Sequence, residues 1–158
     1  MRSKEVKIGA AMVAMAVAAL VGGAAWAADR GTAKEAEAMV KKGIAYIKAN
    51  GKDKGYAEIT NKKGQFVDRD MYLIVLQADG TMLANGANAK LVGLNRMDSQ
   101  VFDGKFAIRE MIEAAKSKNG TWTEYKYSDP VTHKVLDKAN YCERLEPSTL
   151  VCGGYYKQ

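Results

Sequence analysis

Hydrophobic positions follow a helical period from residue 32 onward and a strand period further along the chain. Across residues 32–50, apolar side chains recur every three or four positions, which predicts an amphipathic helix. Thr32 and Glu35 have the spacing of a capping box at its start, and Asn50-Gly51 favours its end. Residues 53–60 could form a short second helix.

The pattern then favours strands around one more helix. The run MYLIVLQ and the residues after its Asp-Gly turn predict a hairpin over residues 71–85. A helical period returns at residues 106–116. Three more strands are expected at residues 121–127, 135–145 and 149–156. This order predicts an α+β domain in which a long N-terminal helix packs on an antiparallel sheet of about five strands.

The stretch between the hairpin and the third helix reads mainly as loop. Residues 86–103 carry no regular period, and Gly86, Gly93 and Asn95 interrupt them. A loop of this length inside a compact domain usually has a function, most often as a binding loop or a lid. If the protein binds a small molecule, we expect the cavity to lie beneath this loop.

The amino terminus has the composition of a targeting segment. A basic start is followed by residues 8–24 without any charge, and Ala25-Trp26-Ala27 offers small residues at a cleavage site. We therefore predict a cleaved signal peptide at residues 1–27 and a periplasmic mature domain at residues 28–158. The alternative is an uncleaved membrane anchor, because the apolar stretch of residues 8–28 is long enough to cross a bilayer.

Composition and charge exclude several function classes. Loss of residues 1–27, which hold three basic residues and one acidic residue, would lower the net charge from +6 to +4. The other basic residues are scattered among acidic ones, so we expect no nucleic-acid partner. Two cysteines and the single His133, expected in an exposed turn, provide no zinc cluster or haem motif. Without a catalytic or nucleotide-binding fingerprint, we expect no enzyme, no cofactor and no metal.

The two cysteines are placed symmetrically about a predicted turn. Cys142 and Cys152 lie at equal distances from Pro147. In a tight hairpin they would face each other on antiparallel strands, within reach of a disulfide. Because an exported protein meets an oxidising compartment, we predict a structural disulfide. The alternative is a redox-active pair, although neither cysteine lies in a Cys-x-x-Cys motif.

Short motifs along the chain occur in the order and spacing of a known sensor family. They are GQFVD (64–68), DMY (70–72), DGTMLANG (79–86), LVGLN (91–95), DGKF (103–106), YKYSDPVT (125–132), KANY (138–141) and GGYY (153–156). Over about residues 32–157 the chain resembles a stand-alone single Cache domain of type 2, a PAS-like extracellular sensor module of bacterial receptors and histidine kinases. Asn85 stands where this family often has histidine, and Tyr127-Ser128 replaces a common Trp-Pro pair.

The resemblance implies binding rather than catalysis. Similar domains hold a small molecule between one sheet face and the loops above it, mostly small organic acids, with amines and other metabolites also represented. In receptors the domain is joined to a transmembrane helix and an output module, whereas here the sequence ends at Gln158. We therefore expect a periplasmic sensor that acts in signal transduction or chemotaxis through a partner, such as a membrane receptor, a kinase or a transporter. A homodimer formed through the long first helix is also consistent with the resemblance.

A small carboxylate in a mostly apolar cavity needs hydrogen-bond donors, preferably cationic ones. Candidate ligand-binding residues are Tyr72, Asn85, Arg96, Tyr125, Lys126, Lys138 and Tyr141. Strand alternation puts Tyr125 and Lys126 on opposite faces, and likewise Lys138 and Tyr141, unless a bulge intervenes. Tyr72 and Tyr141 could instead be core aromatics, and the lysines could lie on the solvent face.

Two functions from different classes remain open. The first is the small-molecule sensor. The second is a non-catalytic structural or interaction protein of Cache fold whose pocket has closed. The departures at Asn85 and at Tyr127-Ser128 would then be signs of pocket decay. A cavity with polar walls favours the sensor, and a filled aliphatic interior favours the interaction protein.

Overall fold

The computed structural model describes residues 29–157 of the chain as an α+β domain. Its elements are α1 (Ala33–Asn50), α2 (Lys52–Thr60), β1 (Val67–Asp68), β2 (Met71–Gln77), β3 (Met82–Asn85), the short 3-10 turn η1 (Ala89–Leu91), α3 (Ala107–Ser117), β4 (Thr121–Ser128), β5 (Val135–Glu146) and β6 (Thr149–Tyr156). The predicted signal peptide at residues 1–27 lies outside the described residues and remains a prediction.

The predicted fold class is confirmed. Each predicted helix and strand forms within one or two residues of its predicted bounds. The sheet has six strands instead of about five, because the two-residue strand β1 is too short to show a period in the sequence. The predicted capping box is also present: the Thr32 hydroxyl accepts from the Glu35 N–H, and the Glu35 carboxylate accepts from the Thr32 N–H.

All strand pairs of the sheet are antiparallel. The order is β1-β2-β6-β5-β4, and β3 also pairs with β2 beside β1. The last strand of the chain therefore lies between the first hairpin and the β4–β5 pair. As a result, β2 is buried along six of its seven residues.

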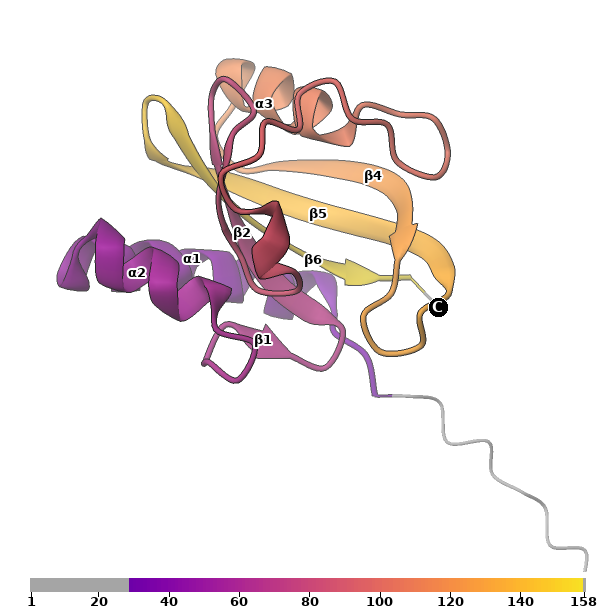
Figure 1. Cartoon of the computed structure of the whole chain (residues 1–158), viewed down its shortest axis with the longest axis horizontal. Coiled ribbons are helices and arrows are strands. Elements are labelled where there is room, and N and C mark those ends of the chain that lie inside the picture. Colours follow the sequence, from indigo (N-terminus) through magenta and orange to yellow (C-terminus); the bar gives the residue numbers. More distant parts are fainter. Residues whose placement is uncertain (1–28, 158) are drawn as a thin grey trace, which may run out of the picture.

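The sheet separates two layers of different composition (Figure 1). Helices α1 and α2 cover one face with an apolar core that includes Val40, Ile44, Leu73 and Val151. At Gly43 a side chain would come within 2.4 Å of Leu73 Cδ1, so glycine lets α1 approach the sheet closely. The other face carries α3 and the loop between β3 and α3 (Figure 1).

The predicted disulfide is present. Cys142 of β5 and Cys152 of β6 are register partners, and their sulfurs are bonded. Both side chains are buried on the face that α3 covers. Within residues 29–157, no helix is both long enough and apolar enough to cross a membrane.

Candidate ligand-binding site

A cavity of about 50 Å³ lies on the sheet face opposite α1, beneath the loop that follows β3. Its lining residues are Tyr72, Ile74, Met82, Asn85, Leu91, Arg96, Ser99, Gln100, Val101, Ala107, Ile108, Tyr125, Tyr127, Lys138 and Asn140. The sheet supplies one wall and the segment from Leu91 to Ile108 supplies the other. The cavity therefore occupies the place that the sequence predicts for a ligand.

Lys138 of β5 brings a charged group into this buried space. The residue is only 2% exposed, and its Nζ lies 3.8 Å from the centre of the Tyr72 ring and 5.0 Å from that of Tyr156. Aromatic faces attract a cation but accept no strong hydrogen bond from it. Within residues 29–157, no hydrogen bond and no ion pair joins Lys138 Nζ to a carboxylate: Asp70 and Asp129 act on it only by Coulomb attraction and pair with Arg30 instead. An anion from solution could supply the charge compensation that this buried ammonium group lacks.

The electrostatic environment of Lys138 follows from its burial. Removal from water lowers the pKa of its ammonium group to about 7, although the negative charges of Asp70 and Asp129 oppose this change. A carboxylate bound beside Nζ would stabilise the protonated form. Burial also raises the pKa values of Tyr72 and Tyr125 well above the usual value for tyrosine, so both phenols stay neutral and can donate hydrogen bonds.

Two asparagine side chains add donors to the cavity wall. Asn85 and Asn140 are 4% and 2% exposed, and each directs its amide nitrogen to a methionine sulfur, Asn85 to Met82 at 3.8 Å and Asn140 to Met111 at 3.4 Å. Sulfur is a weak acceptor, so both amides retain capacity for a stronger one. The side-chain oxygen of Asn85 accepts from the backbone N–H of residue 88 at 2.8 Å, which fixes the start of the loop.

The loop above the cavity is tied to the β2–β3 hairpin. The backbone N–H of Arg96 donates to the carbonyl of Gly80 at 2.8 Å, and the Asn95 side chain donates to the carbonyl of Asp79 at 2.7 Å. Gly80 has φ +92°, a conformation that glycine adopts without strain at this turn. These contacts place the half-buried Arg96 at the cavity. Within the described part of the chain, no carboxylate pairs with its guanidinium group.

A wider groove of about 950 Å³ opens beside the cavity, and Tyr72, Arg96 and Tyr127 line both. Its titratable side chains, apart from the two tyrosines, are Lys62, Arg69, Lys90, Arg96 and His133. No acidic residue is among those that line it within residues 29–157. A positively charged approach attracts anions toward the cavity.

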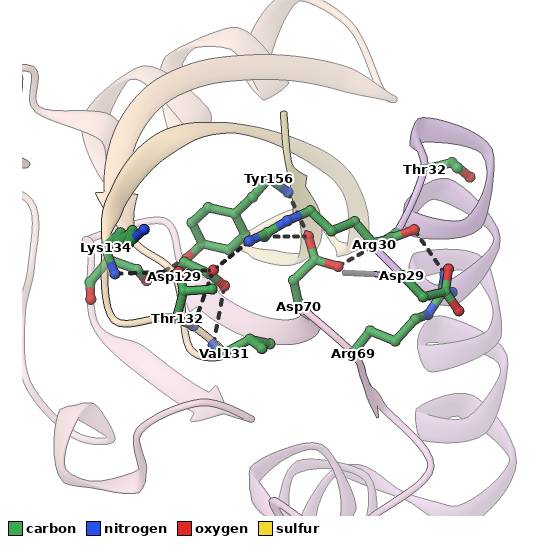
Figure 2. A network of polar contacts seen from close by, with 12 residues as sticks. Asp29, Arg30, Thr32, Arg69, Asp70, Asp129, Val131, Thr132, Lys134 and Tyr156 are labelled. Carbon is green, nitrogen blue, oxygen red and sulfur yellow. Dashed lines mark hydrogen bonds and ion pairs between the residues drawn. The ribbon is translucent and has the colours of Figure 1, made fainter. Parts of the chain in front are cut away.

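Figure 2 shows a second buried polar cluster, formed around Arg30, Asp70 and Asp129. Both acids act on Lys138 by Coulomb attraction. Arg30, just before α1, lies between two carboxylates: its Nη2 donates to Asp129 at 2.8 Å, and its Nη1 is 3.7 Å from Asp70. Burial opposes ionisation of Asp129, but hydrogen bonds from Arg30 and Thr132 hold its pKa at about 2. Both acids are fully buried. Asp129 therefore remains ionised and paired with Arg30 inside the protein.

The arrangement is suited to binding an anion. Cationic and amide donors converge on a small space whose remaining walls are aromatic and aliphatic. Within residues 29–157, no three His, Cys, Asp or Glu side chains come together to hold a metal ion.

Comparison with known families agrees with this fold. The sequence model of the family described as single Cache domain 2 matches residues 3–157. The chain belongs to the single Cache domain 2 family. Cache domains are sensor domains that are typically extracellular or periplasmic and generally non-catalytic. A sequence comparison with curated proteins gives no match.

Solved structures show the same Cache fold. A methyl-accepting chemotaxis protein from Vibrio parahaemolyticus RIMD 2210633 is 24% identical with a TM-score of 0.66, over 78% of this chain and 86% of that one. A Cache chemosensory domain, described in the context of carboxylic acid recognition, is 19% identical with a TM-score of 0.66, over 79% and 92% of the two chains. A periplasmic sensor domain of a chemotaxis protein is 17% identical with a TM-score of 0.61, over 79% and 90%.

The Cache fold brings five of the seven candidate residues to the cavity. They are Tyr72, Asn85, Arg96, Tyr125 and Lys138. Lys126 and Tyr141 lie on the opposite face of the sheet, as strand alternation requires. Lys126 is exposed and pairs with Asp137 at 2.8 Å, whereas Tyr141 is buried in the α1 core and donates to Glu143 at 2.7 Å. Neither lines the cavity.

Some residues of the site were absent from the candidate list. Tyr127 and Asn140 lie two positions beyond Tyr125 and Lys138, so the alternation of β4 and β5 already places each pair on one face. No sequence pattern indicates the Arg30 cluster, because its two acids are 59 residues apart and meet only in the folded chain. His133 is exposed in a turn, as predicted, with a positive φ of 58°.

Proposed function

We propose that this Cache domain is a periplasmic sensor that binds a small organic acid, with Lys138 as the main partner of the ligand's carboxylate. The observation that carries the proposal is the Lys138 ammonium group, 2% exposed, at a cavity and without a carboxylate partner among residues 29–157. A buried charge is costly unless an opposite charge or strong hydrogen bonds compensate it. A carboxylate from solution would supply both.

The other cavity residues support an acid over an amine. Asn85 and Asn140 offer amide donors, and Arg96 offers a second cation. Asp70 and Asp129 are the two acids whose negative charges act on Lys138. Arg30 and backbone N–H groups already bind them. An ammonium ligand would therefore meet cations without a free carboxylate to receive it.

The volume of the cavity supports a small ligand. About 50 Å³ is far below the several hundred Å³ typical of sites for drug-sized molecules. The ligand would then have only a few non-hydrogen atoms, with its carboxylate near Lys138. The carboxylic acid recognition described for a structurally similar Cache domain points the same way.

In the cell, such a sensor would act through other proteins. The similar structures come from chemotaxis proteins, one of them described as periplasmic. With the signal peptide predicted at residues 1–27, we propose export to the periplasm and a role in signal transduction or chemotaxis. The partner would be a membrane receptor, a kinase or a transporter, and a homodimer through α1 would be one way to present the bound state.

The test is a thermal-shift screen of residues 28–158 against small carboxylates, amino acids, amines and purines. A ligand at a hundred times its dissociation constant stabilises the native state by about 2.7 kcal/mol, a rise of several degrees for a domain of this size. We expect a rise with short carboxylates and none with amines. Absence of a response to any compound, in folded protein free of bound ligand, would favour the interaction protein.

Two lysine variants sharpen this screen. Lys138→Met removes the buried ammonium group with little change in volume and is expected to abolish the carboxylate response while the protein stays folded. Lys126→Met removes an exposed lysine from the neighbouring strand on the other face and is expected to leave the response intact. Equal responses in both variants would contradict the assignment of Lys138.

A further inference from the structure

Two buried carboxylates lie close enough to Lys138 to act on its charge, yet neither pairs with it. Asp70 and Asp129 are both 0% exposed, and both favour the protonated state of Lys138 by Coulomb attraction. Tyr156 connects the groups: it is the register partner of Lys138, its ring centre lies 5.0 Å from Lys138 Nζ, and its backbone N–H donates to Asp70 at 2.9 Å. Carboxylates at these positions compete with a ligand carboxylate for the Lys138 ammonium group.

Other groups occupy these two carboxylates. Asp70 accepts from the backbone N–H of Gly31 at 2.6 Å, in addition to that of Tyr156. Asp129 accepts from Arg30 Nη2 at 2.8 Å, and Arg30 Nη1 lies 3.7 Å from Asp70 (Figure 2). The Arg30 side chain is itself only 11% exposed. One arginine therefore lies between both acids and supplies the positive charge that they would otherwise draw from Lys138.

Asp129 is bound so completely that it has little capacity left for Lys138. Besides Arg30, it accepts from the backbone N–H groups of Val131 and Thr132, at 3.1 and 3.2 Å, and from the Thr132 hydroxyl at 2.5 Å. Together the cluster contains two carboxylates, one guanidinium group and the ammonium group of Lys138. Without Arg30, the two acids would lack their guanidinium partner, and their attraction for the Lys138 ammonium group would no longer be balanced.

We propose that Arg30 is a positioning residue of the ligand site: by holding Asp129 and Asp70, it keeps the Lys138 ammonium group available to an anion from solution. Its role in ligand affinity rests on the proposed function, whereas its effect on Lys138 does not. Arg30 does not line the cavity, so it acts through the two acids and not through contact with the ligand.

The position of Arg30 in the chain extends this role. Arg30 belongs to the short segment that precedes α1, and Arg69 fixes that segment by donating to the Arg30 carbonyl at 2.9 Å (Figure 2). Release of the segment would withdraw Arg30 from both acids and weaken anion binding. Because coupling is reciprocal, a bound anion would stabilise the docked segment by the same free energy.

The decisive measurement is the pKa of Lys138 itself, followed by its 13Cε chemical shift in residues 28–158 across a pH titration. We expect Arg30→Gln to raise this pKa toward that of an ordinary lysine, because the uncompensated carboxylates favour the ammonium form. Arg30→Lys keeps the charge and is expected to stay near wild type. The double variant Arg30→Gln with Asp129→Asn restores the charge balance and is expected to return the pKa toward the wild-type value.

Arg144→Gln provides the matched control. Arg144 is an exposed arginine six residues further along β5, about 20 Å from Lys138 in an extended strand. The same loss of charge there is expected to leave the Lys138 titration unchanged. Should Arg30→Gln fail to fold, Asp129→Asn alone decides the question, because removal of one attracting carboxylate must lower the pKa of Lys138 below its wild-type value.

The second arm is calorimetric titration of propionate at neutral pH. Arg30→Gln is expected to weaken propionate binding about tenfold, a typical size for coupling between sites, and the double variant is expected to recover it. An unchanged Lys138 titration in folded Arg30→Gln, or in Asp129→Asn, would overturn the proposal. Propionate binding equal to wild type in Arg30→Gln would also overturn it. If propionate does not bind the wild type, the organic-acid function loses support, while the Lys138 titration still decides the role of Arg30.

Discussion

The two faces of the sheet use neighbouring residues of the same strands for opposite purposes. On the α1 side, Leu73 and Val151 are fully buried in an apolar layer. On the other side, Tyr72 lies beside a cavity, with Lys138 and Asn140 buried nearby. The α1 face excludes both water and charge, whereas the cavity face keeps a buried lysine and two amides whose protein partners are weak.

This difference indicates that one face of the sheet stabilises the domain and the other is suited to recognise a ligand. Close packing makes the α1 face stable and indifferent to solutes. Polar groups with incomplete partners make the cavity face costly to fold but able to recognise an anion. On that face the disulfide and the Arg30 cluster add covalent and ionic ties around the cavity. The comparison can be tested by changing each face separately.

The largest effect is expected from the α1 face. Leu73→Ala removes a fully buried side chain that packs against Gly43, and we expect a loss of about 3 kcal/mol in the free energy of unfolding. Chemical denaturation measures it. Ile74→Ala is the control on the cavity side of the same strand. It is expected to cost less and to change carboxylate affinity, and the reverse pattern would contradict the division between the faces.

Loss of the disulfide is expected to have the next largest effect. Replacement of both Cys142 and Cys152 by alanine removes a link across 10 residues, and we expect a loss of about 2–3 kcal/mol. Denaturation of the variant, compared with wild type under reducing and non-reducing conditions, measures it. Reduced wild type should behave like the variant. If reduction leaves wild-type stability unchanged, the disulfide contributes nothing measurable.

The pH dependence of stability is expected to reveal the buried lysine. Because the pKa of Lys138 is about 7 in the fold and about 10.4 in an unfolded chain, the unfolded state binds more protons between these values. Stability then rises with pH above 7, by about 2 kcal/mol between pH 7 and pH 9 from this residue. Lys138→Met is expected to remove that part of the slope. Identical slopes in variant and wild type would show that Lys138 titrates normally.

The smallest effect is expected at the exposed lysine of β4. Lys126 and Asp137 form an ion pair at 2.8 Å with 48% and 61% exposed side chains. Such pairs contribute little, so Lys126→Met is expected to change the free energy of unfolding by less than about 0.5 kcal/mol. The measurement is the same denaturation series used for Lys138→Met. A large loss here would mean that the outer face of β4 is covered by another molecule in solution.

The helices and strands could be predicted from the sequence because the patterns that indicate them are local. The period of α1, its capping box and the Asp-Gly hairpin each depend on residues a few positions apart. The Cys142–Cys152 pairing followed from symmetry about one turn. The strand β1 was missed because two residues cannot establish a period.

For the site, the alternation of side chains along each strand predicted which residues share a face. Contacts between distant segments could not be predicted from the sequence. Alternation separated Tyr125 from Lys126 and Lys138 from Tyr141, and both pairs lie on opposite faces in the fold. It could not say which of the two faces holds the cavity. That choice depends on where α1 packs, because the helix fills one face and leaves the other to the loop and α3.

By itself the sequence determined the order and type of the elements, the Cache family resemblance and the pairing of the cysteines, since all of these are set by neighbouring residues or by short motifs. The tertiary structure decided that Lys138 is the buried cation at the cavity and that Arg30 meets Asp70 and Asp129. The physical reason is that burial and charge pairing depend on which distant segments come together. In this domain the last strand, the loop after β4 and the segment before α1 come together, and their charges act on one lysine.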